Sequence, residues 1–170
     1  MPPLDDERFA DLFRRHYPRL VGLARRVLGD ADEAQDAAQE ALLALRKDAV
    51  ATRSDDDVAA WLSRVVTNVS LNRLRSRRRA DVRAQVVAAR DVRVLPDEPD
   101  DEVVVADERA RVRTALGVLP ERQATALLLR HAGHSYREIA TALGVAEGSV
   151  GVLLARGERA FRRAHEEMTR

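Results

Sequence analysis

Cysteine is absent from this chain of 170 residues, and several other residue types are scarce. Without cysteine there is no disulfide, no thiolate nucleophile and no thiolate metal site. Aromatic residues make up only 4% of the chain, so its core has to be built from Leu, Val and Ala. Lys47 is the single lysine, and nearly every cation is therefore an arginine, whose guanidinium suits phosphates and base edges.

An excess of one charge is also missing. The 29 basic and 28 acidic residues leave a net charge of +1, so overall charge does not point to a polyanionic partner. No apolar run approaches the ~18 residues needed to span a bilayer. The N-terminus is acidic and lacks an apolar signal core. We therefore expect a soluble, cytoplasmic protein without membrane insertion.

Residues for catalysis do not gather in any recognisable motif. His16 and His165 are far from the other two histidines in sequence. His131 and His134 could share a helix end, but no acidic ligand set accompanies them. There is no Gly-rich phosphate loop, nucleophile elbow or HExxH motif. The sequence predicts a protein that is not an enzyme, with no catalytic residue, no metal site and no cofactor.

What the chain does have is helical periodicity, which predicts an all-α fold. Residues 1–80 form a first helical block and residues 107–170 a second, smaller one. Between them, residues 81–106 lose the periodicity, and Pro96 and Pro99 favour an extended, flexible linker. The linker is strongly acidic around these prolines, through Asp97, Glu98, Asp100, Asp101 and Glu102.

The stretch from Ser135 to Arg163 has the pattern of a helix-turn-helix. Ser135 and Glu138, three residues later, predict a capping box at the start of the first helix. Gly144 predicts its end, and a second, basic helix follows. Such a pair commonly presents its second helix to the major groove of DNA. An ordinary αα-hairpin in a helical domain is the alternative.

A third predicted helix, starting near Val58, carries a stripe that changes character along its length. Its members lie three or four residues apart, so they share one face: Trp61, Val65, Asn68, Asn72, Arg75 and Arg79. Apolar walls can accept a base, an amide can read its edge and arginines can hold a backbone. The alternative is a core tryptophan, solvated amides and a solvated basic helix end.

The basic run from Arg73 to Arg79 meets no acid along the chain until Asp81. Like charges at that density repel one another unless a polyanion or water screens them, which favours nucleic acid modestly. In the preceding helix, a second partly polar face is either solvated surface or a docking face for another protein. It consists of Asp36, Gln39, Glu40 and Leu43.

Taken together, three segments resemble the extracytoplasmic-function group of bacterial RNA polymerase sigma factors. Residues 9–45 resemble the family's first conserved helices, residues 57–79 its promoter-melting segment and residues 119–163 its C-terminal DNA-reading segment. Each match alone is weak, but their order along the chain makes the resemblance specific. It implies a subunit that binds core RNA polymerase and directs promoter recognition, melting and initiation, with nucleotide chemistry left to the polymerase.

The resemblance also implies partners and contact residues. The second helix would dock on the β′ clamp helices through Asp36, Gln39 and Glu40. The −10 element would be melted and an unstacked base held by Trp61, Val65, Asn68 and Asn72. Phosphates there would be held by Arg73, Arg75, Arg77 and Arg78.

For the C-terminal block, the resemblance implies binding to the tip of the polymerase β flap and to the −35 element. The −35 residues would be Ser135, Ser149, Arg156, Arg159, Arg162 and Arg163. The acidic linker would thread the active-site cleft and RNA exit channel, and family members often have an anti-sigma factor as a further partner.

One departure from the family concerns the recognition helix, which is usually polar and basic. Here Gly151, Val152 and Ala155 replace side chains expected to reach DNA, and Glu158 occupies a position where a basic residue is usual. We expect weakened direct reading of −35 bases, or an apolar face that binds protein instead. Two other functions therefore stay open: a stand-alone helix-turn-helix regulator, and a polymerase-binding module with degenerate −35 reading.

Overall fold

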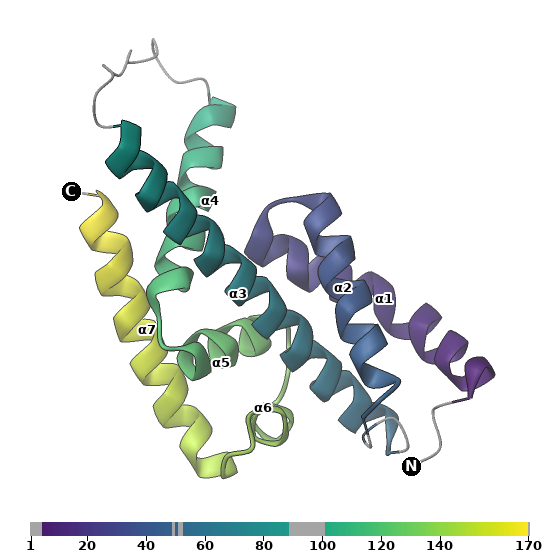
Figure 1. Cartoon of the computed structure of the whole chain (residues 1–170). Helices are drawn as coiled ribbons and strands as arrows, with labels where there is room; N and C mark the ends of the chain where they lie inside the picture. The colour runs from purple at the N-terminus through teal and green to yellow at the C-terminus, as the bar shows by residue number, and fades with distance from the viewer. Residues whose placement is uncertain (1–4, 49, 51–52, 89–100, 170) are drawn as a thin grey trace.

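A computed structural model describes residues 5–48, 50, 53–88 and 101–169. Within these ranges the chain forms seven α-helices and no strand, which confirms the predicted all-α fold (Figure 1). The helices are α1 (Asp6–Leu28), α2 (Ala31–Leu45), α3 (Asp55–Ala88), α4 (Asp101–Val118), α5 (Glu121–His131), α6 (Tyr136–Leu143) and α7 (Glu147–Thr169).

The first block consists of α1, α2 and the first part of α3. Aspartates cap the two opening helices: Asp5 accepts from the backbone N–H of Arg8, and Asp30 from that of Glu33. Gly29 ends α1 with a φ of 73°, a left-handed conformation that favours glycine. The three helices bury a core of leucines, alanines and valines, among them Leu12, Leu42, Leu62 and Val66. The core residues expected from the scarcity of aromatics are therefore the ones found.

The second block consists of α4 to α7 and ends in the predicted helix-turn-helix. Ser135 and Glu138 form the predicted capping box, and Gly144 ends α6 with a φ of 63°. The axes of α6 and α7 differ by 91°. At Gly157, α7 approaches α5 so closely that a Cβ would lie 3.1 Å from the Leu127 side chain, a tight contact that favours glycine.

Helical structure extends further towards the middle of the chain than the sequence predicts. α3 continues to Ala88 and α4 begins at Asp101, so the segment expected to be an extended linker is helical at both described ends. The acids Asp97, Glu98 and Asp100 lie outside the described residues. The separation between helices is thus shorter than the predicted 81–106, and the division into blocks at these positions stays a prediction.

The two blocks are in contact, a point that periodicity leaves open. α3 runs through the middle of the molecule, with α1 and α2 on one side, α5 to α7 on the other, and α4 crossing it (Figure 1). Ala60 of α3 is buried in one cluster with Leu129 and Ile139. Val27 and Leu71 of the first block are buried in another, together with apolar side chains of α4 and α5.

No single helix among the described residues is both long enough and apolar enough to cross a membrane. Only α6 and α7 counted together, across their sharp bend, reach that length and composition.

Candidate nucleic-acid interface

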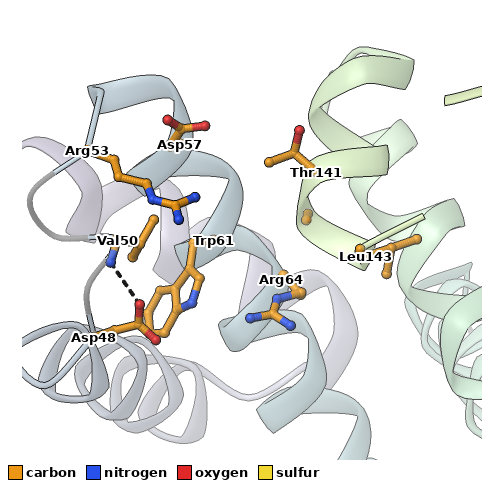
Figure 2. Close-up of a pocket in the computed structure, with 10 residues that line it drawn as sticks. Asp48, Val50, Arg53, Asp57, Trp61, Arg64, Thr141 and Leu143 are labelled. Carbon is orange, nitrogen blue, oxygen red and sulfur yellow. Dashed lines mark hydrogen bonds between the residues drawn. The ribbon is translucent and has the colours of Figure 1, made fainter. Parts of the chain in front are cut away.

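The stripe predicted on α3 begins at a cleft between the two blocks. Trp61 and Val65 are half-buried and pack against the first core. Trp61 also lines a cleft of about 240 Å³, whose floor and near wall carry Arg53, Asp57 and Arg64. Figure 2 shows Thr141 and Leu143 of α6 on the opposite wall. The tryptophan is therefore partly a core anchor, as the alternative held, and partly a cleft surface.

Asn68, the first amide of the stripe, already has a partner in the second block. Its Oδ1 accepts a hydrogen bond of 3.0 Å from the Oγ1 hydroxyl of Thr125 on α5. Thr125 is 1% exposed, so this bond is shielded from water. Asn72, one turn further along α3, is exposed. One of the two amides is thus covered and the other is open.

Arg75 is the most firmly held member of the basic run. Its Nε donates to the backbone carbonyl of Gly117 at 3.2 Å and its Nη2 to that of Leu119 at 2.9 Å. Its Nη1 also lies 3.8 Å from a carboxylate oxygen of Glu121. These contacts attach α3 to the turn between α4 and α5.

Two neighbouring arginines are bound within the first block. Arg73 pairs with Glu40 at 2.9 Å and donates to the backbone carbonyl of Glu33 at 3.1 Å. Arg77 forms an ion pair with Glu33 and donates to a backbone carbonyl at the end of α1. Along the chain no acid follows this run before Asp81, but the fold brings acids from α2 and α5 to it. Arg78 remains exposed.

The polar face predicted on α2 is open to solvent. Asp36, Gln39 and Glu40 are exposed, and Leu43 is 58% exposed on the same side. An unburied leucine among polar side chains gives the face an apolar contact point. Glu40 links this face to the α3 stripe through its ion pair with Arg73.

A buried histidine forms a further contact between the blocks. His134, 1% exposed, precedes α6, and its Nε2 lies 3.0 Å from the Oγ of Ser63 on α3. The Arg19 guanidinium of α1 lies 3.4 Å from the same nitrogen and donates to the backbone carbonyl of Ala132. Burial, and secondarily the charge of Arg19, lower the pKa of His134 below its usual 6.5. The arrangement in which the two blocks are in contact, called closed below, therefore favours the neutral form of His134.

The outer face of α7 differs from the α3 stripe in having no such contacts. Among the described residues, no hydrogen bond or ion pair engages the side chains of the predicted −35 contacts on this helix. These are Ser149, Arg156, Arg159, Arg162 and Arg163, and all are exposed. Ser135, by contrast, is committed to the capping box, with its backbone N–H 2.7 Å from the Glu138 carboxylate. Those Ser135 hydrogen bonds lower the pKa of Glu138.

An apolar groove on the second block was missed by the sequence reasoning. It has a volume of about 430 Å³ between α4, α5 and α7, and its lining includes Val112, Leu127 and Phe161. Each of these fits an inward helical stripe, so periodicity alone could not identify them as lining an open groove.

Groups that could hold a metal ion are not found in the described part of the chain, where no three His, Asp or Glu side chains come together.

Comparison with known proteins places both blocks in one family. The sigma-70 region 2 model matches residues 12–80, and the sigma-70 region 4 model matches residues 109–161. The ECF RNA polymerase sigma factor SigM of Mycobacterium tuberculosis is 36% identical over 154 residues, which cover 86% of this chain and 71% of SigM. The RNA polymerase sigma-H factor of Pseudomonas aeruginosa is 32% identical over an alignment of 174 positions, which covers 97% of this chain and 90% of that protein.

A solved structure supports the fold. The sigma factor RpoE of Bartonella quintana, crystallised with the anti-sigma factor NepR, matches with a TM-score of 0.55 and 20% identity, covering 93% of this chain and 96% of that one. The predicted resemblance is therefore confirmed. This chain belongs to the extracytoplasmic-function (ECF) RNA polymerase sigma factors, non-enzymatic factors that direct the initiation of transcription at promoters.

Proposed function

We propose that this chain binds core RNA polymerase through the first block, opens promoter DNA with α3 and holds the −35 element with α7. The observation that carries the proposal is the order of the two sigma regions along a chain whose exposed faces suit these contacts. In this proposal residues 1–80 act on the polymerase and the −10 element, and residues 107–170 act on the −35 element and the flap. The polymerase supplies the chemistry, in the cytoplasm.

The contact with the polymerase is assigned to the exposed face of α2. Asp36, Gln39 and Glu40 offer carboxylates and an amide, and Leu43 offers apolar area in their midst. A mixed surface of this kind suits a protein partner better than it suits a polyanion. The β′ clamp helices are the proposed partner.

Promoter opening is assigned to the α3 stripe. Trp61 and Val65 would wall an unstacked base, with Asn68 and Asn72 at its edge. The phosphates would be held by Arg73, Arg75, Arg77 and Arg78. Because Asn68 and Arg75 are occupied by α5 and by the turn before it, this role requires the two blocks to separate first. The closed arrangement is thus proposed as the free form, and polymerase binding as what opens it.

The −35 element is assigned to the exposed side of α7, from Ser149 to Arg163. Ser149, Arg156, Arg159, Arg162 and Arg163 are accessible in the closed form, and Ser135 would act mainly through the helix end that it caps. The apolar groove beside Phe161 suits the tip of the β flap. An anti-sigma factor that binds both blocks is a further proposed partner.

The role of Asn68 in melting is tested by a matched pair of substitutions. Asn68→Ala and Thr125→Val each delete the same interblock hydrogen bond, but only Asn68 is proposed to touch DNA. Asn68→Ala should impair open-complex formation on a promoter, measured by permanganate reactivity of unpaired thymines, while core binding is retained. Thr125→Val should leave melting intact. Equal melting by both variants would refute the base-pocket role.

Binding without polymerase separates the sigma factor from a stand-alone regulator. A regulator protects its operator alone, whereas the proposed function predicts weak protection by the free chain and firm protection by the holoenzyme. Failure of purified core polymerase to retain the chain would refute the proposed function as a whole.

A further inference from the structure

The first three turns of α7 present an apolar surface where a DNA-reading helix needs base contacts. Val152 is 51% exposed, and Ala155 is exposed next to it on the same side. Tyr136, at the start of α6, is 42% exposed and borders this surface. None of the three lies among the residues buried between the blocks, so the surface is accessible even in the closed form.

Two glycines lower the profile of this surface. A Cβ added at Gly148 would meet no atom within 4 Å, and one added at Gly151 would meet only the ring of Tyr136, at 3.8 Å. A side chain at either place would therefore meet no tight contact, in contrast to Gly157. Glycine on an exposed helix costs stability but allows another molecule to approach the backbone closely. Because neither glycine has a side chain, Val152 supplies the exposed apolar side chain of this turn.

Charge identifies which partner this surface suits. Arg137 is exposed on α6, and Arg156 and Arg159 continue the Val152 side of α7 at helical spacing. In the described residues these guanidiniums have no acidic partner, so they can bind a polyanion without breaking an ion pair. An apolar centre flanked by free arginines suits base edges flanked by phosphates. Acids are present too, since Glu147 and Glu158 lie on the same helix.

The chemistry of the major groove then narrows the choice of base. Arginine, asparagine and glutamine read bases by hydrogen bonds, but neither Val152 nor Ala155 has a donor or acceptor in its side chain. The C5-methyl group of thymine is the apolar feature that distinguishes one base pair from another in this groove. Resting on the proposed function, we infer that Val152 determines −35 specificity by contacting thymine methyl groups, with Gly148 and Gly151 allowing α7 to seat closely against them. Apolar contact thus takes the place of the missing bidentate contacts.

The test removes the methyl group from the DNA and the methyl groups from the protein in turn. Holoenzyme assembled from core polymerase and the full chain selects duplexes from a promoter fragment randomised over the −35 region. The selected sequences should contain thymine. Replacing each such thymine by deoxyuridine, which lacks only the methyl group, should weaken binding about three- to fivefold per methyl.

The substitution Val152→Ala removes the methyl groups from the protein instead of from the DNA. It should bind the thymine duplex about as weakly as the unchanged protein binds the deoxyuridine duplex, and it should no longer distinguish the two. Val118→Ala is the matched control, because Val118 is also an exposed valine of the second block, at the end of α4. That control should keep full sensitivity to deoxyuridine.

Each contrary result has a separate meaning. Equal affinity of the unchanged holoenzyme for both duplexes overturns the thymine contact, while intact promoter opening in the same assay leaves the proposed function standing. If Val152→Ala loses binding to core polymerase, this face of α7 binds protein, and that result also overturns the thymine contact. A holoenzyme that does not assemble, or selects no sequence, overturns the proposed function and this inference with it.

Discussion

The stripe on α3 and the outer face of α7 are both proposed to meet promoter DNA, yet they differ in what already binds them. On α3, Asn68 and Arg75 are held by α5 and by the turn before it. On α7, Arg156 and Arg159 have no partner among the described residues. If both proposed roles hold, the free protein presents the proposed −35 face at once, and the proposed melting stripe becomes accessible only after the two blocks separate.

The largest expected effect comes from locking the blocks together. Asn68→Cys with Thr125→Cys, joined by a short bifunctional thiol reagent, holds α3 against α5, and no native cysteine competes in the reaction. Because the competent open form should then fall below about 1% of the molecules, promoter opening should drop roughly a hundredfold. Transcription by the cross-linked protein is compared with that of each single-cysteine variant. Full activity of the locked protein would contradict the closed form as a barrier.

Removal of an arginine should lower stability on α3 but not on α7. Arg75→Ala deletes two hydrogen bonds to carbonyls between the blocks and should lower the free energy of unfolding by about 1–2 kcal/mol. Arg159→Ala has no such bonds to lose, so stability should change by less than about 0.5 kcal/mol. Its effect should be on DNA: affinity falls uniformly across sequences, and the salt slope of holoenzyme binding decreases by about one. Denaturation and salt titration of both variants check the contrast.

Acid should loosen the contact between the blocks through His134. Its pKa in the closed form lies below 6.5, so below about pH 6.5 the separated form binds the extra proton. Closure therefore weakens as pH falls through this range, by at most about 1.4 kcal/mol per pH unit, and the loss levels off below the lowered pKa. Energy transfer between dyes on α2 and α7 measures closure. Burial lowers the pKa of His16 as well, so His134→Gln is the control that must abolish the local response.

The smallest effect is expected at Gly151. Gly151→Ala should stabilise the second block by about 0.5–1 kcal/mol, because alanine favours a helix and the new Cβ makes only ordinary contact with Tyr136. If α7 seats closely on DNA, the same change should slightly weaken −35 binding. Gly151→Arg separates two accounts of this helix: it should weaken binding to −35 duplexes if α7 seats closely, and strengthen it if missing contacts explain weak reading. Unchanged duplex affinity would favour a protein-facing or differently angled helix.

Local features were predictable from the sequence and long-range ones were not. The capping box of Ser135 and the helix end at Gly144 depend on neighbours within four residues, so spacing was enough. The hydrogen bond from Thr125 to Asn68 joins residues 57 apart, and no sequence pattern of these two common polar residues predicts that they pair. The end of α3 at Ala88 was missed because the sequence after Arg79 lacks the regular apolar period that marks a buried helical face.

The candidate site was predictable in the same uneven way. Family resemblance and the 3.6-residue period placed Asp36, Gln39 and Glu40 on one face, and they are exposed together as a docking role requires. The basic run was harder, because Glu33 and Glu121 reach Arg77 and Arg75 only through the fold. Sequence spacing could identify the stripe, but it could not tell that the free protein covers part of it.

In the proposed complex with promoter DNA, the continuous helix α3 would fix the spacing between its contacts. From Trp61 to Arg78, the last arginine proposed to hold phosphate, the helix advances 17 residues, about 26 Å at 1.5 Å per residue. At 3.4 Å per base pair that distance corresponds to about seven to eight steps of duplex. Because α3 is one continuous helix, the number of residues would set the spacing between the proposed base pocket and that phosphate contact. One inserted residue would lengthen it by about 1.5 Å and rotate everything beyond it by about 100°.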